Sequence, residues 1–434
     1  MVVQSGWVDP VAKFADVASR PGVAWLDAVT GKGYSILAAE PACVFRAKGR
    51  HCDVDGDRFE GDPLAVLDEL LQKRRVAAGG DFPTGGAIGY FGYDLKNVIE
   101  ELPATVDDDL GLPDCWFGFY DDLLVFDHAR QIAVEVRCSG GSVSRRPLSE
   151  QETAGASQKR RYTGQLHSNF TRESYGAAVR RAKAYIAAGD IYQVNLSQRF
   201  QCGVESGPVE LYHALRAANP APYGAYLDIG PAQILSSSPE CFLRMNGREI
   251  VTRPIKGTLP RHRDPDDLLR SPKDNAELLM ITDLERNDLG RVCEYGSVHV
   301  PELVTVESYA TVHHLVATVA GQLKPDVSHV QAVRTCFPGG SITGAPKIRA
   351  MEIIDELEPH ARGVYCGAIG YFGYNDVSHF SIAIRTAVHQ SGFLTFHAGG
   401  GIVADSEPNA EYDETLAKAQ GIINALDHLR LRQR

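Results

Sequence analysis

The sequence predicts an α+β fold built on large, mostly antiparallel β-sheets. Short strand-like segments follow one another with short turns, and the helical segments are grouped instead of alternating with single strands. The octapeptide Gly86–Tyr93 also recurs without change as Gly367–Tyr374, with strand-like residues on both sides of each copy. We therefore expect an internal duplication, in which two similar β-hairpin elements use their glycines for close packing or bulges.

The individual elements follow from the same patterns in chain order. Strands are expected at 122–127 and 131–137. Thr171 can cap a helix that carries its apolar residues on one face and ends at Gly189, and the alternating run 191–200 predicts a strand. Further strands are expected at 223–228, 241–245, 365–374, 378–386 and 393–397, and further helices at 272–284, 346–358 and 409–429.

Composition limits the classes of function. The 434 residues are 44% hydrophobic and 23% charged, as in a soluble globular protein. The net charge of −11 disfavours binding to nucleic acid or to an anionic membrane. The start of the chain lacks the charged and apolar regions of a signal peptide, and no apolar run approaches the roughly 18 residues of a membrane span, so we expect a cytoplasmic protein.

Nine cysteines are scattered along the chain without a C-x-x-C pair and without a histidine at zinc spacing. We interpret them as reduced, mostly buried thiols. None has the exposed setting of a cysteine nucleophile, so the chain offers no site for glutamine hydrolysis.

Lys256 is the most informative single residue. It lies in the segment Arg253–Thr258, and no carboxylate occurs within six positions on either side. Burial among such neighbours would lower the pKa of its ammonium and favour the neutral amine, which is a nucleophile. The alternative is a lysine at the end of a strand with its head in solvent.

Other segments of the second half form a set with the one around Lys256: Leu235–Glu240, Ser271–Gly290, Pro338–Lys347, Ala383–Ala387 and Glu411–Lys418. Together they resemble the chorismate-utilising enzymes, which include anthranilate, isochorismate, salicylate and aminodeoxychorismate synthases. The resemblance implies two large sheets packed on each other, helices outside, and a site in a cleft between them.

The resemblance also implies how the chain is organised. Residues 1–140 are expected to form the amino-terminal half of the fold and a candidate effector or structural region. The stretch Ser35–Pro41 there lacks the Leu-Leu-Glu-Ser segment that anthranilate synthases often carry for tryptophan feedback. Polar residues 141–165 predict a linker or loop, residues 166–428 a chorismate-binding catalytic region, and residues 429–434 a polar tail.

Two pairs of carboxylates suggest a metal site. Asp274 and Glu277 face one direction on a helix, as do Glu411 and Glu414 on the last helix, and oxygen ligands alone favour Mg2+. The resemblance implies that Mg2+ bridges to the substrate carboxylate, held by Glu277 and Glu414, with Asp274 and Glu411 binding directly or through water. Two alternatives are a capping carboxylate at Asp274 and a surface ion pair between Glu414 and Lys418.

By the same resemblance, Glu240 is the general acid that protonates the departing 4-hydroxyl, with a surface glutamate as the alternative. Lys256 would attack ring carbon C2, and ammonia would then attack C4 and expel the lysine. The product would be 4-amino-4-deoxychorismate, which leads to p-aminobenzoate and folate. Alanine replaces this lysine in most other branches, and enzymes that add water at C2 carry a lysine where this chain has Gln193.

Substrate-binding residues are also implied. Tyr365 and Arg385 would hold the enolpyruvyl carboxylate, with help from the backbone of Gly399, Gly400 and Gly401 and from Lys418. His314 would lie near the leaving hydroxyl, and Thr258, Gln193 and Thr343 would line the pocket. The loop Gly339–Lys347 lacks the pattern of a nucleotide-binding P-loop, and turn formation is its alternative role.

Two alternatives to this function remain at the level of sequence. Anthranilate synthase component I shares nearly every motif except Lys256. A non-catalytic chorismate-binding subunit is the alternative from another class, although it would not require an acid and a nucleophile. Because the chain offers no glutaminase, we expect a separate glutamine amidotransferase subunit to supply ammonia.

Overall fold

The computed structural model describes residues 2–137, 164–309 and 312–432. The predicted linker therefore lies almost entirely outside the described residues. Within these ranges, no helix has the length and apolar composition needed to cross a membrane. The eight cysteines among them are all buried and unpaired, as expected.

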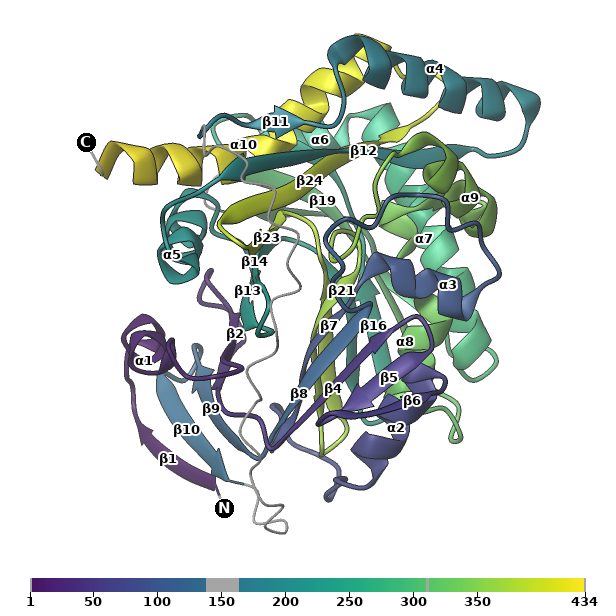
Figure 1. Ribbon diagram of the computed structural model, residues 1–434. Coiled ribbons are helices and arrows are strands. Elements are labelled where there is room, and N and C mark those ends of the chain that lie inside the picture. Colours follow the sequence, from purple (N-terminus) through teal and green to yellow (C-terminus); the bar gives the residue numbers. More distant parts are fainter. Residues whose placement is uncertain (1, 138–163, 310–311, 433–434) are drawn as a thin grey trace.

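Two large antiparallel sheets form the protein, as the sequence predicted (Figure 1). The first sheet has the strand order β1 (Val2–Gly6), β10 (Ile132–Arg137), β9 (Asp122–Asp127), β3 (Tyr34–Ala38), β2 (Ala24–Asp27), β13 (Tyr223–Asp228), β14 (Gln233–Ser238), β23 (Thr386–Gln390), β24 (Phe393–Ile402), β12 (Gln193–Gly203) and β11 (His167–Ser168), and β20 (Gly344–Ala345) also pairs with β12.

The second sheet contains the remaining strands and again takes them from both halves of the chain. Its order is β17 (Ile255–Pro260), β19 (Val312–Gln322), β16 (Glu249–Arg253), β15 (Cys241–Asn246), β22 (Val377–Ile382), β21 (Ala368–Gly373), β7 (Gly86–Phe91), β8 (Cys115–Tyr120), β4 (Cys43–Lys48), β5 (His51–Val54) and β6 (Asp57–Glu60), and β18 (His299–Ser308) also pairs with β19.

Helices cover the outer faces of both sheets. In Figure 1, α4 and α10 run side by side over the first sheet, and α2, α7 and α8 lie outside the second. The bounds are α1 (Pro10–Val17), α2 (Pro63–Gln72), α3 (Lys96–Ile99), α4 (Arg172–Ala188), α5 (Pro208–Ala218), α6 (Asp266–Leu269), α7 (Pro272–Val292), α8 (His329–Cys336), α9 (Lys347–Leu357) and α10 (Pro408–Arg432), with 3₁₀ turns η1 (Tyr93–Leu95) and η2 (Gly340–Ile342).

The inner faces of the sheets pack on each other. One buried apolar cluster takes Ile36 and Val125 from the first sheet and Ile88 and Tyr371 from the second. A second cluster joins the outer face of the first sheet to α1, α5 and α10. Burial of these apolar surfaces is the main stabilising contribution to the fold.

The repeated octapeptides pair with each other at the centre of the second sheet. Strands β7 and β21 run antiparallel, with Gly89 opposite Gly370 and Gly86 opposite Gly373. A Cβ atom at Gly89 would lie 1.9 Å from the carbonyl oxygen of Trp116, and one at Gly370 would lie 2.0 Å from that of His379. Both glycines therefore allow the next strand to approach closely.

The strand order extends this symmetry to the whole fold. From the β2–β13 pair, the first sheet continues as β3, β9, β10, β1 on one side and β14, β23, β24, β12 on the other. From the β7–β21 pair, the second continues as β8, β4, β5, β6 and as β22, β15, β16, β19. Corresponding strands follow one another in the same chain order, which supports the predicted duplication. The second half differs by inserting β17, α6, α7 and β18 before β19.

Most predicted elements are confirmed, although several differ in length: α7 runs to Val292 and β24 to Ile402, beyond the predicted ends at 284 and 397. The predicted helix between Thr171 and Gly189 has both caps, because Thr171 accepts from the Ser174 amide and Gly189 is left-handed. The predicted strand 378–386 is wrong at its end: β22 stops at Ile382, Arg385 has a positive φ of 52°, and the chain crosses to the first sheet at Thr386. Helix α10 continues to Arg432, so it includes most of the predicted tail.

Candidate active site

A β-bulge presents Lys256. Strand β17 pairs with β19, and the register shifts between Lys256 and Thr258. Gly257, between them, has a φ of +64°, and a Cβ atom there would lie 3.1 Å from the side chain of Asp274. Glycine is therefore required both by the backbone and by the close approach of helix α7. The bulge thus places Lys256 where strand β17 packs against helix α7.

The Lys256 amine lies among polar groups of Ser341, Glu240 and Glu277. Its Nζ donates a hydrogen bond of 3.2 Å to the carbonyl oxygen of Ser341. Burial lowers the pKa of Lys256, and the nearby charges of Glu277 and Glu240 oppose this effect only in part. Lys256 is partly buried and its amine is bonded to Ser341, which disfavours the alternative of a lysine with its head in solvent.

Glu240 lies beside this lysine in the loop between β14 and β15. Its side chain is 5% exposed, so it is not a surface glutamate. Burial raises its pKa, and hydrogen bonds from the Ser341 hydroxyl and the Ile255 amide, together with the charge of Lys256, limit the rise. Ser341 thus contacts both the amine and the carboxyl, through its carbonyl and its hydroxyl respectively.

His314 lies on β19 opposite Thr258. Its Nδ1 is 3.2 Å from the carbonyl oxygen of Gly257 and 3.1 Å from the Thr258 hydroxyl. A carbonyl oxygen only accepts, so Nδ1 carries the proton and Nε2 is the acceptor in the neutral ring. Burial lowers the pKa of His314 and favours this neutral form.

Three charged side chains of helix α10 converge over one glycine of β24. A Cβ atom at Gly400 would lie 3.2 Å from Glu414 Oε1, 3.4 Å from Glu411 Oε2 and 3.5 Å from Lys418 Nζ. Lys418 also donates to the carbonyl of Gly399 at 3.0 Å and lies 2.6 Å from Glu414. The ion pair considered as the alternative role of Glu414 is therefore present, but it lies within the site.

The two carboxylates of this group differ in their electrostatics. Burial raises the pKa of Glu411, and the Ser406 hydroxyl, which donates to it at 2.6 Å, counters part of the rise. Burial also acts on Glu414, yet the Lys418 ammonium holds its pKa below the usual value. Glu414 thus favours its charged form more strongly than Glu411 does.

The second pair of carboxylates, Asp274 and Glu277, lies on helix α7 near Lys256. Burial raises the pKa of Glu277, and the charges of Asp274 and Glu414 add to this effect while Lys256 and Lys273 oppose it. Asp274 lies against Gly257, and its backbone amide donates to the Ser271 hydroxyl that caps the helix. In the described part of the chain, no three potential ligands are gathered within metal-binding distance.

Gln193 lies at the start of β12 and faces the glycines of β24. A Cβ atom at Gly401 would lie 2.1 Å from its Nε2. Gln193 is 1% exposed, and its Oε1 finds no hydrogen-bond partner among the described residues. A buried amide oxygen without a partner is costly, so a ligand that donates a hydrogen bond would complete this position.

Arg385 interacts with Tyr365 and lies beside helix α10. Arg385 donates to the carbonyl oxygen of Lys418 at 2.7 Å, and its left-handed backbone is a strained conformation for arginine. Tyr365 is buried, and its ring stacks on His397 with centroids 5.0 Å apart. Burial raises the pKa of Tyr365 and lowers that of Arg385.

The loop before helix α9 is held by hydrogen bonds within the loop and by an ion pair to helix α7. Thr343 is fully buried, and its hydroxyl donates to the carbonyls of Gly339 and Gly340, so it has the turn-forming role. Its contact with substrate stays a prediction. Lys347, at the end of the loop, forms a buried ion pair with Asp288 of helix α7.

Sequence reasoning missed three residues of this region. Ser341 lies in the segment Pro338–Lys347, and Lys273 and Glu285 lie in Ser271–Gly290, but the sequence patterns assign no role to any of the three. The two glycines before Ser341 indicate that the backbone packs closely against a neighbouring segment there, and this was the one signal in the sequence for Ser341. Nothing local distinguishes Glu285 from an exposed helical glutamate.

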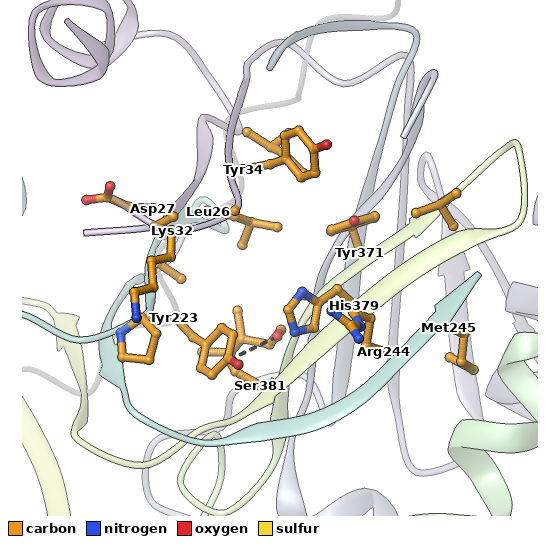
Figure 2. A pocket seen from close by; sticks show the side chains of 18 of the residues that line it. Leu26, Asp27, Lys32, Tyr34, Tyr223, Arg244, Met245, Tyr371, His379 and Ser381 are labelled. Atoms are coloured by element: carbon orange, nitrogen blue, oxygen red, sulfur yellow. Dashed lines mark hydrogen bonds between the residues drawn. The ribbon is translucent and has the colours of Figure 1, made fainter. Parts of the chain in front are cut away.

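A separate cavity of about 450 Å³ lies between the two sheets at their centre (Figure 2). Its walls come from both halves and include Lys32, Tyr34, Tyr223, Arg244 and His379. Burial lowers the pKa of His379 to about 4, so this ring is neutral. None of the expected catalytic residues lines this cavity.

Known proteins resemble this chain over most of its length. The family described as chorismate binding enzyme matches residues 22–424. Aminodeoxychorismate synthase component 1 of Escherichia coli is 43% identical over 91% of this chain and 90% of its own length. Anthranilate synthase component 1 of Thermus thermophilus is 40% identical over 96% and 95%. The crystal structure of anthranilate synthase component I from Streptococcus pneumoniae has a TM-score of 0.78 at 32% identity, covering 90% of this chain and 92% of that chain. This chain therefore belongs to the family of chorismate binding enzymes.

Proposed function

We propose that this enzyme has aminodeoxychorismate synthase activity and converts chorismate and ammonia to 4-amino-4-deoxychorismate and water. This is the activity named for the E. coli relative. The observation that carries the proposal is the enclosed amine of Lys256, which lies beside the buried acid Glu240 and shares Ser341 with it.

The first step follows from the opposite pKa shifts of these two groups. Burial favours a neutral amine at Lys256 and a protonated carboxyl at Glu240. Glu240 gives its proton to the C4 hydroxyl, which leaves as water while the Lys256 nitrogen bonds to C2 and both ring double bonds shift. The adduct nitrogen then returns a proton to the Glu240 carboxylate.

The second step releases the enzyme. Ammonia bonds to C4, both ring double bonds shift back, and Lys256 leaves with the electron pair of its bond to C2. The departing Lys256 nitrogen takes up one proton, and the new ammonium at C4 loses one. Lys256 returns to the neutral amine, and the enolpyruvyl side chain is retained. His314, with Nε2 as an acceptor, would accept a hydrogen bond from the C4 hydroxyl and orient it before it leaves.

Mg2+ fits the donor chemistry of the site. Glu277, Glu411, Glu414 and Asp274 offer only oxygen ligands, and Glu411 and Glu414 already converge over a glycine that leaves room for an ion. When bound, Mg2+ would neutralise these carboxylates and hold a carboxylate of the substrate. Glu277 and Glu414 are the proposed direct ligands.

The second carboxylate of the substrate needs cationic and backbone donors. Arg385 supplies a planar guanidinium near Tyr365, and Lys418 supplies an ammonium. We assign the enolpyruvyl carboxylate to this group and to the backbone of Gly399–Gly401. The unpartnered Gln193 Oε1 would accept a hydrogen bond from the substrate or from ammonia.

The relatives named component 1 support a partner subunit, and we propose that it is a glutamine amidotransferase that supplies ammonia. The amino-terminal half is proposed to serve an effector or structural role. The cavity between the sheets is its candidate effector pocket, because residues of this half line one side of it.

Product analysis tests the proposed activity. Purified protein is incubated with chorismate, Mg2+ and a high concentration of ammonium salt, and the product is separated and identified by mass against standards. Aminodeoxychorismate is expected. Anthranilate would contradict the branch assignment, and an absence of turnover, even with a glutamine amidotransferase added, would favour a non-catalytic subunit.

A further inference from the structure

Glu285 is a buried carboxyl that the reaction steps above do not use. It lies on helix α7 and is 3% exposed, although the neighbouring residues Arg286 and Asn287 face solvent. Its Oε1 accepts a hydrogen bond of 3.0 Å from the backbone amide of Gly340. A buried carboxyl that reaches back to a loop amide fixes that loop relative to its helix.

The loop residue it holds is adjacent to Ser341. Ser341 accepts from Lys256 through its carbonyl and donates to Glu240 through its hydroxyl. The peptide between Gly340 and Ser341 is therefore a short connection from Glu285 to both reacting groups. Contact with the helix is close, since a Cβ atom at Gly340 would lie 2.5 Å from Leu284.

We propose that Glu285 is a positioning residue, which holds the Gly340–Ser341 segment so that Lys256 and Glu240 face the substrate in reactive geometry. The inference rests on the proposed function and deepens it, because it assigns the support of the acid and the nucleophile. The two carboxyls also interact electrostatically, since the charge of Glu240 contributes to the raised pKa of Glu285.

Several ionisable groups surround Glu285. They are Asp288 of the same helix, Lys347 of α9, Glu240 and Cys336. Burial is the largest effect and Asp288 adds to it, so that the pKa of Glu285 rises to about 8. Near neutral pH its carboxyl is therefore mostly protonated, and its carbonyl oxygen still accepts from Gly340.

Two substitutions separate the acceptor from the charge. Glu285→Gln keeps an oxygen for the Gly340 amide and resembles the protonated carboxyl in shape. Glu285→Met fills a similar volume but leaves the amide without an acceptor. If Glu285 positions the loop, the glutamine variant should work almost normally at neutral pH and the methionine variant should not.

The expected results concern kcat more than KM. In Glu285→Met, kcat for chorismate consumption should fall about 10- to 100-fold, because a displacement of about 1 Å can cost this much, while KM changes less than about 3-fold. In Glu285→Gln, kcat at pH 7 should stay within about 3-fold of wild type. Because Glu285 stays protonated while Glu240 loses its proton, the glutamine variant should also keep the alkaline limb of the wild type.

Controls distinguish positioning from loss of folding. Leu279→Ala changes an exposed residue of the same helix and should leave kcat and the pH profile unchanged. The thermal midpoint of each variant shows whether it is folded. Wild-type kcat in Glu285→Met, or a loss of kcat in Glu285→Gln as large as that in Glu285→Met, would overturn the inference.

The test remains separate from that of the proposed function. Chorismate consumption is followed by loss of its absorbance, which does not depend on the product. A wild type that forms another product contradicts the proposed function while the positioning test still stands. If the wild type consumes no chorismate, a crystal structure of Glu285→Met decides: Ser341 is expected to move away from Lys256, and an unmoved Ser341 would overturn the inference.

Discussion

The Nζ atom of Lys256 donates a hydrogen bond of 3.2 Å to the carbonyl oxygen of Ser341. The loop and the strand that meet in this contact lie far apart in the sequence, yet the same serine also bonds to Glu240 through its hydroxyl. A nucleophile and an acid that share one residue keep a fixed relation to each other. This relation is what the proposed two-step reaction requires.

Replacement of Lys256 by alanine removes the proposed nucleophile. The rate of aminodeoxychorismate formation should fall by at least about 10³-fold, as in other enzymes that lose a covalent nucleophile. The thermal midpoint should change little, because the lost group is a desolvated amine. Product analysis and thermal unfolding of the same preparation check both statements. Full activity of Lys256→Ala would contradict the covalent route.

The pH dependence of kcat should have two limbs. Glu240 must be protonated, and because burial raises its pKa, activity should persist above the usual range of a glutamate and fall as pH rises through the raised value. Lys256 must be neutral, and its lowered pKa makes the amine available at lower pH than usual. Activity should therefore fall as pH decreases through that value.

Glu240→Gln provides the matched test of the alkaline limb. Its kcat should decrease about 10²- to 10⁴-fold, because the leaving hydroxyl is no longer protonated. The remaining activity should have no alkaline limb from this group. A rate profile with the same alkaline limb as wild type would assign that limb to another residue.

The buried ion pair between Glu358 and Arg362 is hydrogen-bonded to strand β12, which also carries Gln193. Glu358 also accepts from the amide and hydroxyl of Ser197. Glu358→Ala should reduce the free energy of unfolding by about 3–5 kcal/mol, because it leaves a buried guanidinium without its partner. Glu356→Ala is the control, since Glu356 pairs with Arg181 at the surface and should cost less than about 1 kcal/mol. Denaturant titration measures both.

The glycines of the repeat should not tolerate a side chain. In Gly89→Ala the new methyl group would meet the backbone of Trp116, so the cost should reach or exceed the about 1–3 kcal/mol typical of overpacking. Gly290→Ala is the control: nothing lies within 4 Å of its Cβ position on helix α7, and alanine should stabilise the helix by about 0.5–1 kcal/mol. A thermal midpoint of Gly89→Ala equal to wild type would contradict the close approach seen here.

Local patterns predicted much of the fold. Strands 122–127 and 223–228 have the predicted bounds, and Thr171 and Gly189 end their helix as their residue types require. The pairing of the two octapeptides could not be predicted, because periodicity shows that a strand exists and not which strand lies beside it. The break after Ile382 depends on a crossing between sheets that no local pattern marks.

The site was predictable where the motifs themselves carry the reacting groups. The structure places Lys256 beside Glu240, within reach of the charges of Glu277 and Glu414, and His314 contacts Gly257 and Thr258 next to it. Contacts with chorismate and Mg2+ stay predictions. The role of Glu285 could not be derived from sequence, because it depends on helix α7 packing against a loop that lies far along the chain.

Covalent trapping tests the central claim most directly. Wild-type protein is mixed with chorismate and Mg2+ in the absence of ammonia, quenched, digested and analysed by peptide mass, with Lys256→Ala treated in parallel. The account predicts a substrate-derived adduct on the peptide that contains Lys256 and none on the variant. An unmodified Lys256 in an enzyme that forms aminodeoxychorismate once ammonia is added would contradict it.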